Sequence, residues 1–381
     1  MNVLRLQTAE QGLGLRFLAH NPVRLAAAVA GVAVAVLIMF VELGLLLGVL
    51  NSQAMVASRI NGDLVVMDQA RVDLHKWTDV RDIRLHQIAA VPGVADVVPI
   101  YQGTMGLRNP PDKAIRRIVV FAFPANDVPF DIGNAEKISR VLRVPGSVLY
   151  DRLSRPIFGP IRRGQDIELD GTLYNMAGFV SLGPDVVNDG AVVMSEGDWL
   201  SRHPGDQPIM GAIRLERGAD VGDVQARILA ALPKDITVMT PAKVRSREFL
   251  FTLKAAPIGI LFGIGMLAGL VIGAITCYQI LFNEIVDRFA QYATLRAMGF
   301  SDAFFRRVIL EQAVLLSLGG FVAGALLSWI AYVYLAHATS LAVRFDLFSL
   351  VFVLLLTVGM TVMAGLFALK PVAHADPASL Y

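Results

Sequence analysis

Four long apolar runs constrain this sequence more than any other feature. A helix needs about 20 apolar residues to cross the hydrocarbon core of a bilayer. Four runs reach that length, over residues 25–50, 255–283, 308–336 and 347–369. Only Glu42 and Glu311 are charged within them. The first run is longer than the roughly 7–15 apolar residues of a signal peptide, and no convincing cleavage site follows it. We therefore predict four uncleaved membrane-spanning helices.

Charged residues are concentrated between the first two runs. Of the 204 residues in 51–254, 49 are charged, against 17 of the other 177. Such a contrast is typical of a membrane protein with one large water-exposed insert. The net charge of +2 excludes a nucleic-acid binder that depends on bulk positive charge. The single cysteine, Cys277, excludes an intrachain disulfide and is expected to be a buried apolar side chain.

The insert has the pattern of a mixed α and β domain. β-branched and apolar residues predict strands over 63–67, 118–123 and 191–194. Helical spacing over 77–90 and 221–232 is followed each time by a proline and then by a strand, over 94–101 and 236–239. The fold class is therefore a four-helix membrane protein with an α+β extracytoplasmic domain between helices 1 and 2.

The positions of lysine and arginine predict the orientation. Eight of them lie near span ends on the side of the N-terminus, whereas the loop after the third span holds only Arg344. An excess of positive charge marks cytoplasmic segments. We predict an inner-membrane protein with both termini in the cytoplasm. Its segments are a cytoplasmic amphipathic N-terminal segment (1–24), the first span (25–50), a periplasmic domain (51–254), the second span (255–283), a cytoplasmic loop (284–307), the third span (308–336), a short periplasmic loop (337–346), the fourth span (347–369) and a cytoplasmic tail (370–381).

The spans hold small residues at helical spacing and one acid. Such spacing lets helix backbones approach closely, either within the chain or against a second copy. The glycines concerned are Gly265, Gly269, Gly273, Gly320 and Gly324. Glu42 is a candidate intramembrane polar site, because a charge in a span is costly. The alternative is a protonated or hydrogen-bonded packing residue, and no chain of acids or histidines supports a proton relay.

Patterns typical of enzymes are missing from the sequence. No glycine precedes a lysine, so there is no phosphate-binding loop. The six histidines show no metal-ligand spacing. We therefore assign no catalytic, cofactor-binding or metal-binding residue. The basic pairs Arg116–Arg117 and Arg162–Arg163 are read as solvated surface, with acidic lipid or a partner as the alternative.

The loop between the second and third spans carries the clearest functional signal. An amphipathic helix continues from the second span, Gly299 suits the position after a helix end, and Ser301 suits the start of the next helix. This arrangement would present Tyr292, Leu295, Met298 and Phe300 to the cytosol. Exposed apolar groups of this kind favour a protein partner, although a helix lying in the lipid interface is the alternative.

This loop resembles the coupling-helix region of the FtsX/MacB permease superfamily, most closely its DevC branch, the permease of a heterocyst-glycolipid exporter. The similar segments are YQILFNEIVDRFAQYATLRAMGF (278–300), VLYDRLSRPIFGPI (148–161), VPGVADVVPIYQG (91–103) and ADPASLY (375–381). They occur in order along essentially the whole chain. The likeness implies four spans and a MacB-like periplasmic domain.

The resemblance also implies a function. Members of the family are permease subunits of ABC-type systems, in which a separate subunit binds ATP and Mg²⁺ and hydrolyses ATP. Motion passes to the periplasmic domain, and DevC-like members work with a membrane-fusion adaptor and a TolC-like duct. They act as homodimers or paired permeases. The implied contact with the ATP-binding subunit consists of Tyr292, Leu295, Arg296, Ala297, Met298 and Gly299.

Three functions remain open at this point. The first is a permease that exports a lipid, glycolipid or other amphiphile. The second is a lipoprotein-releasing permease of the LolC/LolE type. The third is an FtsX-like scaffold that activates a periplasmic hydrolase and transports nothing. In each case this chain is not an enzyme, holds no cofactor and binds no nucleic acid.

Overall fold

The structure is a computed structural model. It describes residues 22–71, 78–109, 114–185, 187–255, 257–289, 291, 294–295, 298–339 and 345–373. The chain divides into two compact units. The membrane unit comprises residues 1–48, 258–339 and 343–381, and the inserted unit consists mainly of residues 49–257. Each unit is described by itself.

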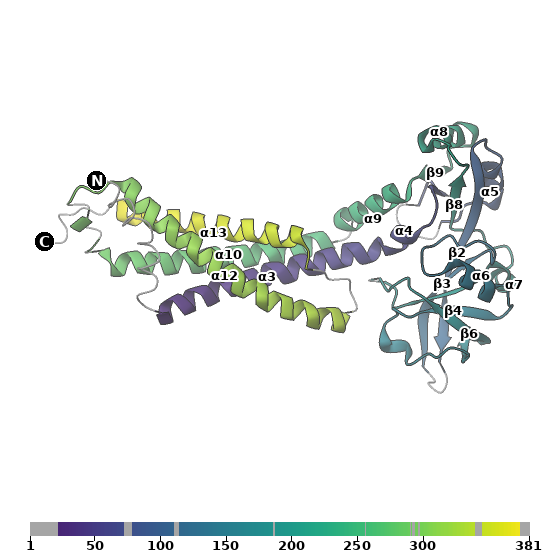
Figure 1. Cartoon of the computed structure of the whole chain (residues 1–381), viewed down its shortest axis with the longest axis horizontal. Helices are drawn as coiled ribbons and strands as arrows, with labels where there is room; N and C mark the ends of the chain where they lie inside the picture. Colours follow the sequence, from purple (N-terminus) through teal and green to yellow (C-terminus); the bar gives the residue numbers. More distant parts are fainter. Residues whose placement is uncertain are drawn as a thin grey trace. The chain divides into compact units, whose positions relative to one another are not determined.

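Four helices of the described chain are long and apolar enough to cross a membrane. They are α3 (Pro22–Gln53), α10 (Ile258–Asp287), α12 (Asp302–Thr339) and α13 (Leu347–Ala373). Helices α3, α12 and α13 extend beyond the predicted runs, into polar residues such as Asn51 and Arg306. Helix α10 instead begins at Ile258, after the predicted start at 255, because Ala255 is the last residue of the preceding helix. Figure 1 shows α3 running alongside α10. The predicted fold class, four such helices with an α+β domain between the first and second, is confirmed.

Helix α3 is the most buried of the four. In its most apolar 18-residue stretch 56% is buried, against 11% for α10. All four helices contribute to one apolar core. Its buried members include Val36, Met39, Phe40, Cys277, Leu316, Tyr332, Val353 and Met360. Cys277 is therefore a buried apolar side chain, as predicted.

The inserted unit is built on a nine-stranded sheet. Its strands are β1 (Leu64–Asp68), β2 (Val94–Arg108), β3 (Ile115–Phe123), β4 (Ser147–Asp151), β5 (Asp166–Leu169), β6 (Thr172–Val180), β7 (Ala191–Ser195), β8 (Met210–Leu215) and β9 (Ile236–Met239). Its helices are α4 (Met55–Arg59), α5 (Asp82–Ala89), α6 (Ala135–Leu142), the single turn η1 (Pro156–Phe158), α7 (Glu196–Arg202), α8 (Val221–Ala231) and α9 (Pro241–Ala255).

One part of this sheet has the order β2-β8-β1-β9, with antiparallel pairs throughout. The chain runs β1-α5-β2 and later β8-α8-β9, so two β-α-β units interlock as in a ferredoxin-like motif. Buried residues of α5 and α8, such as Ile88 and Ile228, pack with Leu64 and Val66 of the central strand β1. The two predicted helix–strand units are thus equivalent halves of this motif.

The other part of the sheet closes on itself. Strand β2 pairs through Val94–Ile100 with β8 and through Tyr101–Arg108 with β3. Its last residues, Leu107 and Arg108, also pair with β5. The order β2-β3-β7-β4-β6-β5 therefore returns to β2 and forms a ring. The 15-residue length of β2 allows one strand to belong to both parts.

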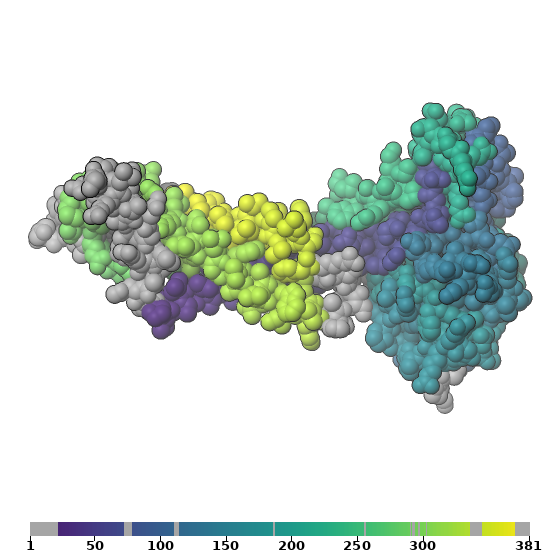
Figure 2. Space-filling view, in the orientation of Figure 1, coloured from purple at the N-terminus to yellow at the C-terminus, as the bar shows by residue number. Residues whose placement is uncertain are grey.

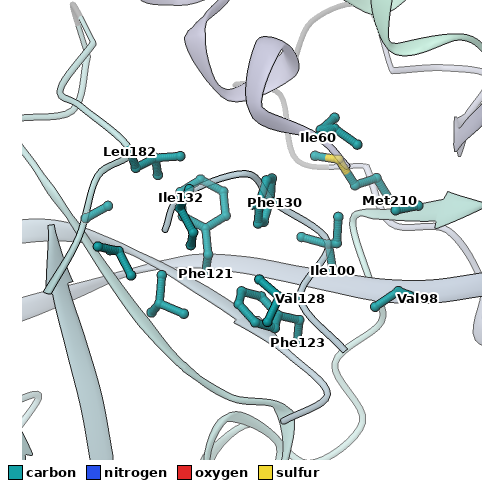
Figure 3. Packing of buried hydrophobic residues seen from close by; sticks show 14 of the residues in the cluster. Ile60, Val98, Ile100, Phe121, Phe123, Val128, Phe130, Ile132, Leu182 and Met210 are labelled. Atoms are coloured by element: carbon teal, nitrogen blue, oxygen red, sulfur yellow. The ribbon is translucent and has the colours of Figure 1, made fainter. Parts of the chain in front are cut away.

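A further core contains the aromatic residues Phe121, Phe123 and Phe130 (Figure 3). The ring centroids of Phe121 and Phe130 are 5.6 Å apart, and those of Phe123 and Phe130 are 6.0 Å apart. Side-chain caps start helices α6 and α8. Asn134 accepts a hydrogen bond from the Lys137 amide at 2.9 Å, and Asp220 accepts one from the Asp223 amide at 2.9 Å.

Helix α5 begins at Asp82, later than the Trp77 expected from the sequence, and Trp77 itself lies outside the described residues. The Val80 amide donates instead to the Pro208 carbonyl at 2.7 Å. Arg84 and Arg81 both pair with Asp235, at 2.8 and 2.5 Å. Their guanidinium groups hold the pKa of Asp235 below its usual value. Tertiary contacts therefore accompany the non-helical conformation of residues 78–81 before the helix start.

Candidate functional site

The turn between α10 and α12 exposes apolar side chains. Met298 is 63% exposed and Phe300 is 38% exposed, while Leu295 is half-buried. Tyr292, Arg296 and Ala297 lie outside the described residues. Three of the six residues assigned to the partner contact, Leu295, Met298 and Gly299, are thus placed at one turn. Apolar groups exposed on a surface favour contact with another molecule.

The backbone explains why the turn has this form. Gly299 has φ +94°, a region that residues with a Cβ avoid. The Phe300 amide donates to the Leu295 carbonyl at 3.2 Å, a 6→1 bond that ends a helix at the position before Gly299. Gly299 is therefore the residue after the helix end, as predicted. Helix α12 starts at Asp302, directly after Ser301.

An ion-pair group lies at the end of α10, just before this turn. Arg24 of α3 pairs with Asp287 and lies 3.9 Å from Glu284, and Arg288 pairs with Glu284 at 2.7 Å. The Glu284 side chain is only 8% exposed. Buried charges need partners of this kind, because desolvation is costly. The first helix is therefore tied to the end of the second by charge.

In the sequence, Arg24 and Arg288 served only to predict the orientation, and this ion-pair group was not predicted. The order of the charges along the chain could have indicated it. If two successive spans run antiparallel side by side, the cation before the first span meets the acids after the second. Gln312 was also missed: it is fully buried, and its amide atoms have no hydrogen-bond partner among the described residues.

The five glycines predicted for helix packing all face α3. A Cβ on Gly265 would overlap the Glu42 carboxylate. One on Gly269 would lie 3.0 Å from Ile38 Cγ2. One on Gly273 would lie 2.8 Å from Ala35 Cβ. Positions 265, 269 and 273 thus match 42, 38 and 35 in reverse order, so α10 packs antiparallel to α3 without room for side chains.

Helix α12 packs parallel to α3 in the same way. A Cβ on Gly320 would overlap the Val32 side chain. One on Gly324 would lie 2.8 Å from the Ala33 carbonyl oxygen and 2.6 Å from Val36. Backbone as well as side chains would therefore block a larger residue. The structure uses these glycines for packing within the chain.

Glu42 lies against α10, eighteen residues beyond Arg24, or about 27 Å along α3. Its side chain is half-buried over Gly265. The role of Glu42 as an intramembrane polar site stays a prediction.

Several polar groups of the inserted unit make contacts within the unit. The buried Asp151 accepts hydrogen bonds from the amides of Leu182 and Gly183 at 3.0 and 2.7 Å. Burial raises the pKa of Asp151, although these bonds lower it. His203 stacks on Trp199. Within the described part of the chain, no group of three His, Cys, Asp or Glu residues is arranged to hold a metal.

The geometry defines a class of protein: a four-helix membrane protein with an α+β domain inserted after the first helix and an apolar turn between the second and third. Residues 263–377 match the family described as FtsX-like permease C-terminal. The matched residues comprise most of α10 together with α12 and α13.

Two solved structures are among those similar to this chain. The periplasmic region of MacB from Actinobacillus actinomycetemcomitans has 9% identity, covers 49% of this chain and 92% of its own length, and gives a TM-score of 0.37. The extracellular domain of the noncanonic ABC-type transporter YknZ from Gram-positive bacteria is 10% identical to this chain. The match covers 47% of this chain and 99% of the YknZ domain, with a TM-score of 0.34. None of the curated proteins compared with the chain matches it significantly.

Proposed function

We propose that this chain is the permease subunit of an ABC-type efflux system, in which a separate subunit hydrolyses ATP. The observation that carries the proposal is the match of residues 263–377 to the FtsX-like permease family. The sequence supports it, because it has no phosphate-binding loop. ATP and Mg²⁺ belong to the partner, and this chain converts the partner's motion into work.

The turn at Leu295–Phe300 is the proposed contact with the ATP-binding subunit. Met298 is its most exposed described apolar residue, at 63%. Gly299 holds the turn in a backbone form that few other residues adopt. A fixed turn with an exposed apolar tip suits insertion into a groove of a partner protein. Tyr292, Arg296 and Ala297 complete the proposed contact.

Motion at the turn has a physical route to α3. Asp287 and Glu284, at the end of α10, contact Arg24 at the start of α3. Helix α10 then packs closely against side chains of α3 at Gly269 and Gly273, so neither helix can shift freely past the other. Helix α3 is continuous from Pro22 to Gln53, and its last residues belong to the inserted unit. A displacement of α10 would thus be passed to the insert.

The finer assignment follows the sequence segments that resemble the DevC branch. We propose a homodimer in the bacterial inner membrane with both termini in the cytoplasm. Its periplasmic domain would contact a membrane-fusion adaptor that leads to a TolC-like outer-membrane duct. The cargo would be a lipid, glycolipid or other amphiphile. In this mechanism the cargo does not pass between the helices, and the insert moves it mechanically.

Co-purification with the ATP-binding subunit tests the proposal. The change is Met298→Asp, which places a charge on the exposed tip of the turn. We expect loss of at least about 90% of the co-purified subunit, because burying an unpaired charge at an interface is strongly unfavourable. Leu173→Asp is the matched control, since Leu173 of β6 is also 63% exposed but lies in the inserted unit. It should leave the complex intact.

Equal recovery of the partner with Met298→Asp and with the control would overturn the assignment of this surface. Met298→Asp is preferred to Leu295→Asp because Leu295 is half-buried. A change at Leu295 would combine loss of binding with loss of local packing. Insertion of each variant into the membrane is checked by fractionation, so a binding defect is separated from failure to fold.

A further inference from the structure

The outward face of α12 near its start carries a groove that the proposed function does not use. The groove has a volume of about 590 Å³. The described part of its lining comes entirely from this helix. The residues are Ala303, Arg306, Arg307, Leu310, Glu311, Val314 and Leu315. Figure 2 shows yellow-green atoms of α12 over much of the visible face of the membrane unit.

The lining follows one helical stripe. Its members recur three or four residues apart, which places them on one side of a helix. Residues between them, including Val308, Ile309 and Ala313, are buried. Helix α12 therefore has an inward face that packs in the protein and an outward face that meets its surroundings.

Charge and apolar character are separated along the groove. Arg306 and Arg307 are exposed at its start, directly before the apolar run of the third span. The described residues supply no ion pair to either guanidinium. Beyond them, Leu310, Val314 and Leu315 continue the groove with apolar side chains, and Glu311 is the only acid in the described lining. The mouth therefore keeps a net positive charge.

The length of the stripe matches one leaflet of a bilayer. From Arg306 to Leu315 the helix rises about 14 Å. Half of the hydrocarbon core is about 15 Å. Arginines at the start of a span extend toward the head-group region while their stems stay in apolar surroundings. A stripe of this length would reach from the head-group region of a bilayer toward its middle.

We propose that this groove binds an anionic phospholipid. The phosphate lies against the Arg306 and Arg307 guanidiniums, which form charge-assisted hydrogen bonds with its oxygens. One acyl chain lies along Leu310, Val314 and Leu315. A free phosphate would gain nothing from the apolar part, and a zwitterionic lipid would offset the attraction with its own cation. The site is distinct from the turn at Leu295–Phe300 and does not depend on the permease assignment.

Native mass spectrometry of the detergent-solubilised full chain tests the site. The probes are phosphatidylglycerol and phosphatidylcholine with identical acyl chains, offered in equal amounts. Two arginines near an anionic surface predict a preference for phosphatidylglycerol on the order of tenfold. Arg306→Gln/Arg307→Gln should reduce that preference to near one. Arg162→Gln/Arg163→Gln removes the same charge from the inserted unit and should preserve it.

A second variant keeps the test decisive if the double glutamine variant fails to fold. Val314→Trp leaves both arginines in place and fills the apolar part of the groove from an exposed position, 37% exposed. It should reduce the amount of either lipid that is retained. Inorganic phosphate, added as a competitor, should not displace bound phosphatidylglycerol.

Several results would overturn the proposal. No preference in the wild-type chain, or an unchanged preference in Arg306→Gln/Arg307→Gln, would show that these arginines do not recognise the lipid. Displacement by inorganic phosphate would indicate a free anion as the ligand. Full lipid retention in Val314→Trp would place the lipid elsewhere. Efficient disulfide formation between copies carrying Ala303→Cys would indicate that a second copy of the chain covers the groove.

Discussion

The two units of this protein pack their elements in different ways. The inserted unit fills its core with large side chains, such as Phe121, Phe123 and Phe130, whose ring centroids lie 5.6–6.0 Å apart. The membrane unit has aromatic contacts of its own, such as Phe40 with Phe345, but its helices also meet at glycines, such as Gly273 and Gly324, where no side chain would fit. The first pattern hides apolar surface from water. The second brings helices close where water is already absent.

The difference follows from the surroundings of each unit. In water, a buried phenylalanine stabilises the fold because it leaves the solvent. In a membrane, lipid is as apolar as leucine, so close packing and polar contacts must hold the helices together. The outward residues of α10, such as Ile260 and Ile264, are accordingly both apolar and more than 60% exposed. In the membrane unit, the small and polar residues therefore carry the specificity.

The largest expected effect tests the inserted unit. Phe123 is fully buried and packs against Phe130. Phe123→Ala should lower the free energy of unfolding of this unit by about 3–5 kcal/mol, because transfer energy is lost and a cavity remains. Thermal unfolding of the full chain, followed by proteolysis of the insert, measures it. Phe179→Ala, at a site 45% exposed, is the control and should have little effect.

If Phe123→Ala and Phe179→Ala destabilise the insert equally, its core does not depend on these aromatic rings. The statement that large buried side chains stabilise the inserted unit would then be wrong. Retained binding of the ATP-binding subunit by Phe123→Ala would further show that the membrane unit folds independently of that core.

A smaller but more specific effect is expected in the membrane unit. Gly324→Ala adds a single methyl group 2.8 Å from the Ala33 carbonyl oxygen. Helices α12 and α3 must separate to accommodate it, at a cost of about 1–3 kcal/mol. Gly263→Ala is the matched control, because a Cβ there meets no atom within 4 Å. The unfolding temperature in detergent should fall only for the first variant.

Two outcomes would contradict this account. An unchanged unfolding temperature in Gly324→Ala would mean that the close approach of α12 and α3 contributes nothing. A loss of stability in Gly263→Ala would show that another molecule, such as a second copy, packs on that face of α10.

Much of this architecture was predictable from local patterns. The apolar runs predict the four spanning helices because the bilayer sets their length. The helix–proline–strand patterns before 94 and 236 predict two equivalent α+β units, which are the halves of the ferredoxin-like motif. Gly299 was predicted as the residue after a helix end, and its φ of +94° agrees. All of these features depend on neighbouring residues alone.

The unpredicted features depend on contacts between distant residues. The ring closes because β2 pairs with both β3 and β5, and nothing local to β2 indicates two partners. Arg24 meets Asp287 across 263 residues of sequence. Gln312 sits in an apolar run, and its burial depends on which face of α12 turns inward. The partner contact remains a prediction, with Tyr292, Arg296 and Ala297 outside the described residues.

The smallest expected effect concerns the ion pairs between α3 and α10. Arg24→Glu places a third acid beside Asp287 and Glu284 and should lower the stability of the membrane unit by about 1 kcal/mol or less, because Arg24 and Asp287 are partly exposed. Arg24→Glu/Asp287→Arg restores opposite charges and should recover the unfolding temperature. Failure of the exchange to recover it would show that the pair contributes nothing specific.

The same pair of variants separates binding from transmission. Because Arg24 lies on α3 and the proposed contact lies beyond α10, Arg24→Glu should still co-purify with the ATP-binding subunit, unlike Met298→Asp. If motion passes from α10 to α3 through this contact, Arg24→Glu should lower export per ATP hydrolysed, and the exchange variant should restore it. Normal export in Arg24→Glu at its reduced stability would show that the packing between the two helices, such as that at Gly269 and Gly273, can transmit the motion without this ion pair.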